Sequence, residues 1–341
     1  MNTKKPRLSL SSSQNKRILK YAPIDLKRVR TYPIEKRKNK VKIVDFAKPG
    51  KEKATFVDFI DSLPFILVGK NFRQISQAIV NAYSKKRPVI LAMGAHVIKC
   101  GLSPILIDLM KRGIVSAVAL NGAGAIHDFE IALRGETSED VARGLDTGIF
   151  GLAEETGKLM NQAINESKEP GLGMGYLLGK KLIEMKAPYE KFSILAAGIK
   201  LDIPVTVHVA IGTDIIHMHP EANGAMIGEK TFNDFRIFTS VITNLEGGVY
   251  LNIGSAVILP EVFLKALTIA RNLGHKVENF TAVNLDMYEH YRPLENVVRR
   301  PTSKGGKGYT LLGHHEILIP LLSQAVIEIM EKEERGENLY Q

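Results

Sequence analysis

A run of small, imidazole and acidic side chains follows one of the apolar stretches of the sequence. The run Asn121–Glu130 begins directly after Ile114–Leu120, which has the composition of a buried strand. In open parallel sheets ligands bind beyond the carboxyl ends of the strands, and glycine there lets the backbone approach a phosphate or a sugar. His127 and Asp128 could orient a sugar or act as acid and base, or Asp128 could cap a helix. We expect a ligand to contact these members of the run: Gly122, Ala123, Gly124 and Asp128.

A second strand end has the features of a dinucleotide site. The apolar run Val249–Ile253 ends in Gly254 and Ser255, and Asp286 ends the next predicted strand 32 residues after Gly254. The amino end of a helix offers free N–H groups to a pyrophosphate, and a carboxylate accepts hydrogen bonds from ribose hydroxyls. The full G-x-G-x-x-G pattern is absent, so a tight turn without a ligand is the alternative. A third strand end, after Val205–Ile211, adds polar groups to the same edge: Gly212, Thr213 and Asp214.

Two groups of histidines pose the question of a metal. His217 and His219 are two residues apart, and His314 and His315 directly precede Glu316. A catalytic zinc ion needs about three protein ligands in a fixed geometry, and spacing alone does not decide whether these rings converge. We favour hydrogen-bonding roles for His217 and His315 and predict no metal. Metal-dependent hydrolysis by His217, His219 and His315 is a third-ranked alternative.

A long polar segment precedes the last apolar run of the sequence. It contains Arg292–Val297 and Thr302–Gly308, and long loops in compact domains are usually functional or disordered. Lys307 stands before the strand-like run Tyr309–Leu312, where it could contact a phosphate or a carboxylate, or form a Schiff base if it is desolvated. A solvated lysine is the alternative.

Alternating apolar runs and helical patterns predict a single α/β domain over residues 54–335. Strand-like Pro88–Met93 and Ile114–Leu120 flank a helical pattern over Ser103–Arg112, which makes a βαβ unit with parallel strands. The alternation continues along the chain, so we predict a doubly wound, mainly parallel Rossmann-like sheet with helices on both faces. The other predicted helices are Phe56–Val68 in part, Phe72–Ser84, Leu152–Ile164, Met174–Met185, Ser193–Leu201, Phe232–Asn244, Pro260–Asn272 and Ile317–Glu334, and Phe280–Leu285 is a further strand.

The positive charge is confined to the beginning of the chain. Residues 1–53 hold 17 Lys and Arg against 4 Asp and Glu, whereas the other 288 residues hold 29 against 32. The net charge of +10 therefore comes from residues 1–53, and the predicted folded domain is slightly acidic. We do not expect nucleic acid as the partner of this domain. We predict that residues 1–53 form a basic, flexible extension. Residues 336–341 have the appearance of a protease-tag remnant.

Composition also limits the class of protein. No apolar run reaches the roughly 20 residues that a membrane span needs, and the amino end lacks the apolar core of a secretory signal. The single cysteine, Cys100, excludes an internal disulfide and a metal cluster held by cysteines. We expect a cytoplasmic protein without a membrane partner.

Six segments follow one another in a recognisable order and spacing: Gly94–Gly101, Gly122–Asp128, Ile203–Val205 leading to Gly212–Asp214, the turn at Gly254, Arg292–Val297 and Ile319–Leu322. Together they resemble the deoxyhypusine synthase family over most of residues 85–330. The resemblance implies a homotetramer built as a pair of dimers, with NAD bound near the subunit interfaces. It also implies amine chemistry in which NAD first oxidises a polyamine to an imine, and an amino-terminal extension that lies over a neighbour's active-site entrance. Gly94 and His96 of the first segment, and also His315, join the residues expected to contact NAD.

The sequence departs from this family at the residues that carry its chemistry. Pro301 stands at the position of the catalytic lysine, Leu259 at that of the active-site histidine, and Arg299 at that of a tryptophan which holds the polyamine. Glu295 is retained. Covalent transfer would need another lysine, so we do not expect true deoxyhypusine synthesis.

The leading hypothesis is an NAD-dependent enzyme that acts on an amine or amino acid through transient dehydrogenation to an imine. The segment Ile126–Glu130 is also similar to archaeal NAD-dependent ornithine cyclodeaminases and saccharopine-related proteins, in which hydride is removed and returned within one site. A non-catalytic binding or assembly module that keeps the fold is the other alternative. The residues expected to bind the substrate or act in catalysis are Asp214, His217, Glu295, Lys304 and Lys307.

Overall fold

The computed structural model describes residues 21, 23–167 and 169–336. The expected tag remnant therefore lies almost wholly outside the described residues, as does most of the first half of the expected basic arm. The chain divides into a unit that ends at Lys42 and a unit that begins at Ile43. The described part of the first unit contains two 3-10 turns, η1 (Leu26–Arg28) and η2 (Ile34–Lys36), and all its side chains are exposed.

The second unit begins before its first long helix. After the turn η3 (Ile43–Asp45), the main chain is held against the segment that follows α1 (Phe56–Ser62). The N–H of Phe65 donates to the carbonyl of Asp45 at 2.9 Å, and the N–H of Lys48 donates to that of Ser62 at 2.8 Å. Residues 43–53, which we expected to belong to the arm, are thus attached to the folded unit.

Six parallel strands form one sheet in the order β3-β2-β1-β4-β5-β6. The order reverses between β1 and β4, so successive crossovers place their helices on opposite faces of the sheet. This confirms the predicted doubly wound parallel α/β fold. The strands are β1 (Val89–Met93), β2 (Ala117–Asn121), β3 (Val205–His208), β4 (Val249–Ile253), β5 (Thr281–Asp286) and β6 (Lys307–Leu312).

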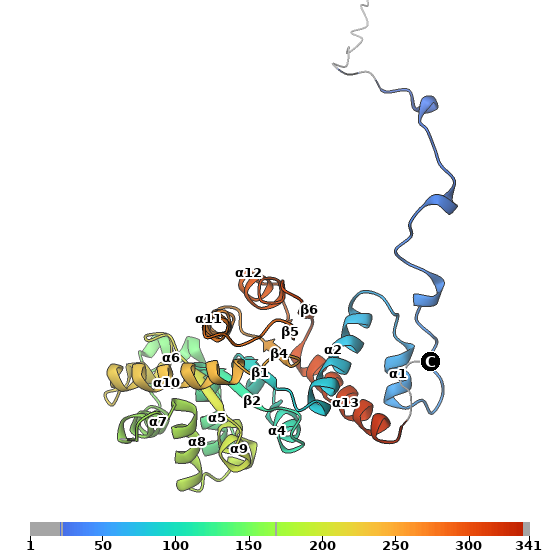
Figure 1. Cartoon of the computed structure of the whole chain (residues 1–341). Helices are drawn as coiled ribbons and strands as arrows, with labels where there is room; N and C mark the ends of the chain where they lie inside the picture. The colour runs from blue at the N-terminus through green and yellow to red at the C-terminus, as the bar shows by residue number, and fades with distance from the viewer. Residues whose placement is uncertain (1–20, 22, 168, 337–341) are drawn as a thin grey trace, which may run out of the picture. The chain divides into compact units, whose positions relative to one another are not determined.

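Helices cover both faces of this sheet, as Figure 1 shows for α11 and α4 on opposite sides of the strands. Successive side chains of a strand point to opposite faces, so Leu251 of β4 enters the larger core and Tyr250 the smaller one. The helices are α2 (Leu67–Ser84), α3 (His96–Lys99), α4 (Ser103–Lys111), α5 (Gly122–Arg134), α6 (Val141–Thr147), α7 (Glu154–Glu166), α8 (Met174–Glu184), α9 (Ile194–Leu201), α10 (Gly224–Ile242), α11 (Ile258–Asn272), α12 (Tyr291–Pro293) and α13 (His315–Glu334).

Some element boundaries differ from the predicted ones. The strand predicted over Val205–Ile211 ends at His208, and the helix predicted from Phe232 begins eight residues earlier at Gly224. Asn223 caps that helix by accepting hydrogen bonds from the N–H groups of Ala225 and Met226. Capping chemistry, and not the apolar pattern, decides where this helix begins.

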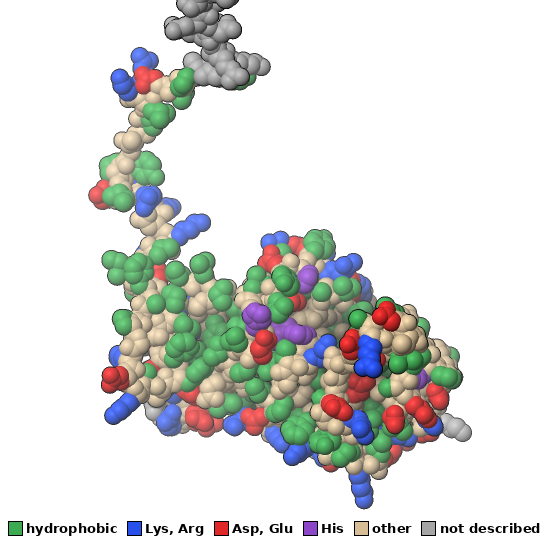
Figure 2. All heavy atoms as spheres, turned by 180° about the vertical axis from the view of Figure 1, so that it is seen from behind, with side chains coloured by type: hydrophobic (Ala, Val, Ile, Leu, Met, Phe, Trp, Pro, Cys, Tyr) green, Lys and Arg blue, Asp and Glu red, His purple; other side chains and the backbone are tan. Residues whose placement is uncertain are grey.

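The surface of the second unit mixes charges of both signs. On the face drawn in Figure 2, acidic and basic side chains lie next to one another and no stripe of one sign stands out. This matches the small net charge of the residues beyond position 53. Among the helices of the described residues, none combines the length and the apolar character that crossing a membrane requires.

A buried carboxylate joins α5 to α9 in the segment between β2 and β3. Asp128 of α5 is fully buried, and one oxygen accepts a hydrogen bond from the N–H of Ile194 at 2.7 Å. The other accepts from Oγ of Ser193 at 2.5 Å and from the N–H of Leu195 at 3.1 Å. Burial raises the pKa of Asp128 to about 6, although these three hydrogen bonds act to lower it. Asp128 therefore caps α9 from another helix, and both its oxygens are engaged inside the protein.

Asp128 predicts a pH dependence of stability. Its pKa is about 6 in the folded protein against 3.8 for an exposed aspartate. Its contribution to the stability of the fold is therefore complete below about pH 4 and is lost as the pH rises through 6. We expect this group to lower the free energy of unfolding by about 3 kcal/mol between pH 4 and pH 7. Urea unfolding of Asp128→Asn should show a flatter pH profile, whereas the exposed control Asp146→Asn should keep the wild-type slope. An unchanged slope in Asp128→Asn would contradict this assignment.

Candidate functional site

Two glycines meet where the strand order reverses. Gly94 follows β1 and donates its N–H to the carbonyl of Ile253 at 2.9 Å, and a Cβ on Gly94 would lie 2.2 Å from the carbonyl oxygen of Gly254. Gly254 itself has a φ of +62°, and a Cβ there would lie 2.7 Å from Cε1 of His315. The protein's own packing at the switch point therefore requires glycine at both positions.

The small residues after β2 make room for a carboxylate. Asn121 caps α5 by accepting a hydrogen bond from the N–H of Gly124 at 2.8 Å. A Cβ on Gly122 would lie 2.0 Å from Oδ2 of Asp214, so Asp214 occupies the space above the first turn of α5. Burial raises the pKa of Asp214, while nearby His217 and the N–H of Ala123 act in the other direction. The small residues after β2 thus help to position the Asp214 side chain at the carboxyl edge of the sheet.

Asp214 and His217 each hold an unmet hydrogen-bonding atom. Nδ1 of His217 accepts from the N–H groups of Gly212 at 3.1 Å and Asp214 at 3.2 Å, which places the imidazole proton on Nε2. That Nε2 and Oδ2 of Asp214 are both buried and without a partner. A donor and an acceptor in this state are what a polar ligand would satisfy.

Unmet polar atoms gather at this edge and just beneath it. Asn252 of β4 donates to Oδ1 of Asn284 of β5 at 2.8 Å and to the carbonyl of Ser255 at 2.9 Å. His315 is buried, and its Nε2 lies 3.3 Å from the carbonyl oxygen of Leu285. Among the described residues, eight buried side-chain nitrogen or oxygen atoms lack a partner, and five of them lie here: Asp214 Oδ2, His217 Nε2, Asn252 Oδ1, Asn284 Nδ2 and His315 Nδ1.

The start of α11 and the end of β5 complete the edge. Val257, at the amino end of α11, makes no side-chain cap, and Oγ of Ser255 accepts only from the N–H of Leu259 at 3.2 Å. Asp286 ends β5, where one of its oxygens accepts from the N–H of Met287 at 2.7 Å. Burial lowers the pKa of His315, so its imidazole is neutral at neutral pH. The strand ends therefore bring together the predicted residues Gly94, Gly122, Asp214, His217, Gly254, Ser255, Asp286 and His315.

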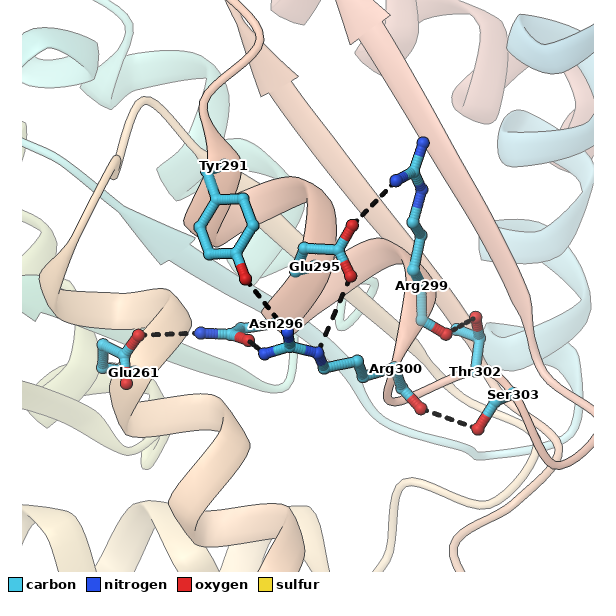
Figure 3. Close-up of polar contacts among 8 residues, drawn as sticks. All are labelled: Glu261, Tyr291, Glu295, Asn296, Arg299, Arg300, Thr302 and Ser303. Atoms are coloured by element: carbon cyan, nitrogen blue, oxygen red, sulfur yellow. Dashed lines mark hydrogen bonds and ion pairs between the residues drawn. The ribbon is translucent and has the colours of Figure 1, made fainter.

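Glu295 lies beside this edge in an ion-pair network. It belongs to the π-helix η6 (Leu294–Arg299), and its oxygens are 2.7 Å from Nη1 of Arg299 and 3.6 Å from Nε of Arg300 (Figure 3). Asn296 accepts a hydrogen bond from Arg300 and donates one at 2.7 Å to Glu261, in the first turn of α11. The charge of Glu295 is thus already balanced by two arginines.

The two predicted lysines lie elsewhere. Lys307 begins β6 and pairs with Thr281, the first residue of β5, whereas Asp286 stands at the other end of β5. Thr281 and Asp286 are five residue steps apart along β5, so the two edges are about 17 Å apart. Lys307 lines a 350 Å³ pocket at the amino ends of the strands, and Lys304 is exposed in the turn before it. The structure does not bring these lysines together with the other predicted residues.

The histidines do not form the metal site considered above. Nε2 of His219 lies 3.0 Å from the carbonyl oxygen of Gly151, and its ring packs against Gly157. Among the described residues, the one cluster of three or more potential ligands with mutually close ligand atoms is His96, Cys100 and Glu316. We did not predict Cys100 or Glu316. The four-residue spacing of His96 and Cys100 is visible in the sequence, but only tertiary structure places Glu316 beside them.

Comparison with known proteins supports the fold. No protein-family model matches the sequence, and a search of curated protein sequences finds no match. Among solved structures, AgrE in a ternary complex with ornithine and NAD+ has a TM-score of 0.52 at 14% identity, over 77% of this chain and 33% of AgrE. The chain thus spans about a third of the length of AgrE.

Two further structures are similar over much of this chain. ArgZ, a cyanobacterial arginine dihydrolase, has a TM-score of 0.47 at 16% identity, over 77% of this chain and 33% of that one. A putative deoxyhypusine synthase from Entamoeba histolytica has a TM-score of 0.49 at 12% identity, over 83% and 97% of the two chains. The resemblance to deoxyhypusine synthase-like proteins is confirmed at the level of the fold, which AgrE shares.

The contact between Gly94 and Gly254 predicts a local intolerance of side chains. We expect Gly94→Ala to lower the free energy of unfolding by about 1–3 kcal/mol, because the new methyl group meets backbone that cannot move away. Gly228→Ala is the matched control, since a Cβ there meets open space within α10, and it should raise stability by about 0.5–1 kcal/mol. Urea unfolding measures both. Equal effects of the two substitutions would show that the switch point is not closely packed.

Proposed function

We propose that the carboxyl edge of the sheet binds NAD at the switch between β1 and β4, and that the protein dehydrogenates an amine or amino acid there. The observation that carries this proposal is the gathering of five unpartnered buried polar atoms at and beneath one edge of a parallel sheet. Open α/β sheets bind ligands beyond the carboxyl ends of their strands at such a reversal of strand order.

The residues at the ends of β4 and β5 are of the types that bind a dinucleotide. The amino end of α11 follows β4, and its dipole favours a pyrophosphate there, although Oγ of Ser255 already accepts from the N–H of Leu259 and Pro260 has no N–H to offer. Asp286 ends the neighbouring strand, and a carboxylate there accepts hydrogen bonds from ribose hydroxyls. NAD, when bound, supplies the acceptor for a hydride. The AgrE structure, which holds NAD+ and ornithine, supports this cofactor and an amino acid as the substrate class.

Asp214 and His217 are suited to hold the substrate. An amine bound as an ammonium must lose a proton before the neighbouring carbon gives up hydride, and Oδ2 of Asp214 is a buried acceptor without a partner. Because burial raises its pKa, Asp214 is a stronger base than an exposed aspartate. The Nε2–H of His217 is a donor that could hold a carboxylate of the same substrate.

The positions of Lys304 and Lys307 favour a reaction without a covalent enzyme intermediate. Lys304 and Lys307 lie at or near the amino ends of the strands, about 17 Å along the sheet from the proposed site, so neither is included as a nucleophile. Without a lysine-bound imine, water or a second amine attacks the imine of the substrate directly. This favours the ornithine cyclodeaminase-like alternative over transfer through an enzyme-bound imine. The expected homotetramer stays a prediction, which sedimentation of the purified chain measures.

Asp286 provides a test of the cofactor. Calorimetric titration of the full chain with NAD should show binding, and Asp286→Asn should weaken it about 10- to 100-fold, because a charge-assisted hydrogen bond to ribose is lost. Asp146→Asn, which changes an exposed carboxylate on α6, should bind like the wild type. If the wild-type chain binds neither NAD nor NADP, or if Asp286→Asn binds NAD as well as wild type, the proposed cofactor site is wrong.

Asp214 provides a test of the chemistry. With ornithine and a panel of amines and amino acids, we expect NAD-dependent release of ammonia without net reduction of NAD, because the hydride taken from the substrate is returned to it within the site. Asp214→Asn should lower kcat about 100- to 10,000-fold and leave NAD affinity unchanged, since it removes a base and not a cofactor contact. In the wild type kcat/KM should rise with pH as Asp214 ionises, and the variant should lack this limb. Wild-type turnover in Asp214→Asn would exclude it as the base.

A further inference from the structure

Three kinds of metal ligand meet on the surface next to the switch point. His96 begins α3, and Cys100 comes directly after its last residue. The two residues are four positions apart, about one helical turn, so both side chains lie on the same side of α3. Glu316 is in the first turn of α13. Each residue offers one ligand atom, and the three atoms all lie within 4.8 Å of one another. His96 and Glu316 are exposed and Cys100 is half-buried, so ions in solution can reach the cluster.

Two more imidazoles stand next to this cluster. The ring of His315 lies 5.7 Å from that of His96, and its buried Nδ1 lacks a partner. Nδ1 of His314 is 3.5 Å from the other side of the Glu316 carboxylate, at Oε1. Histidine side chains gather beside acidic ones on the face shown in Figure 2. The cluster therefore sits in a setting rich in nitrogen donors.

We propose that His96, Cys100 and Glu316 bind one divalent cation of the zinc class, with a fourth position left for His314 or water. Imidazole nitrogen, thiolate sulfur and carboxylate oxygen are the ligands of tetrahedral zinc sites, whereas magnesium and calcium take oxygen ligands. One thiolate and one carboxylate also match the +2 charge of the ion. Three protein ligands and one open position are the arrangement of zinc sites that bind an exchangeable molecule.

The contacts without a metal show what the ion would replace. Sγ of Cys100 lies 3.7 Å from Oε2 of Glu316, a distance at which the thiol donates a weak hydrogen bond. A zinc-class ion takes the place of the thiol proton and keeps the thiolate, carboxylate and imidazole together.

This site stands apart from the proposed cofactor chemistry. Of its ligands only His96 belongs to the residues expected to contact NAD, and the tests of the NAD and substrate proposals use Asp286 and Asp214, so either proposal can fail without the other. Gly94 is two residues before His96, so a bound ion would lie beside the switch point with its open position available to a ligand there.

Cobalt is the probe for this site, because a thiolate bound to Co²⁺ gives a charge-transfer absorption band. The full chain, treated with a chelator and a non-thiol reductant, should develop this band on titration with Co²⁺ and saturate at one equivalent, and Zn²⁺ should abolish it by displacement. Cys100→Ser should lack the band. His96→Ala and Glu316→Gln should weaken Co²⁺ binding at least about tenfold. His290→Ala, which removes an exposed histidine outside the cluster, is the matched control and should bind like the wild type.

Several results would overturn the proposal. One is the absence of the band in the wild-type chain together with no zinc retained after dialysis. Another is a band whose titration is the same in His96→Ala, Glu316→Gln and wild type, since Cys100 would then bind the ion without the cluster. Circular dichroism of each variant confirms that it is folded, and loss of the band in a folded Cys100→Ser supports the assignment.

Discussion

The parallel pairing of β1 with β4 is the contact on which the rest of the structure depends. These strands are far apart in the sequence, and their pairing is what reverses the strand order and sends the crossovers to opposite faces. The chain leaves β1 and β4 toward opposite faces of the sheet, and the backbones of the two turns touch at Gly94 and Gly254. The second of these turns also positions a polar side chain of the candidate site, because His315 packs against Gly254.

Two buried carboxylates organise the segment between β2 and β3, one by joining two of its helices and the other by joining it to β3. Asp128 caps α9 from α5, and Asp234 of α10 accepts hydrogen bonds from the N–H groups of Gly175 and Val207. Burial raises the pKa of both groups, to about 6 for Asp128 and about 7 for Asp234. A carboxylate that satisfies several main-chain donors is costly to replace, which explains acidic residues in the interior without any catalytic role.

The candidate site differs from these structural carboxylates in what is left unpaired. Asp214, His217 and His315 are oriented by main-chain partners or by packing, and each keeps one buried polar atom without a partner. Glu295, by contrast, is balanced by Arg299 and Arg300. Buried polar groups that are held in place but lack a hydrogen-bond partner are typical of a binding site. Charged groups that are already paired are typical of an ion-pair network at the surface.

The sequence by itself determined the fold class and the edge of the sheet that carries the polar residues. Local patterning suffices for this, because apolar runs that end in glycine mark strand ends and parallel strands align those ends. Tertiary structure alone decided the partners. Asp128 was predicted as a ligand contact but caps a helix 65 residues away, Lys307 lies at the opposite edge of the sheet from the other predicted residues, and Glu316 reaches Cys100 across 216 residues. Such assignments depend on long-range packing and strand register, and neither leaves a periodic signal in the chain.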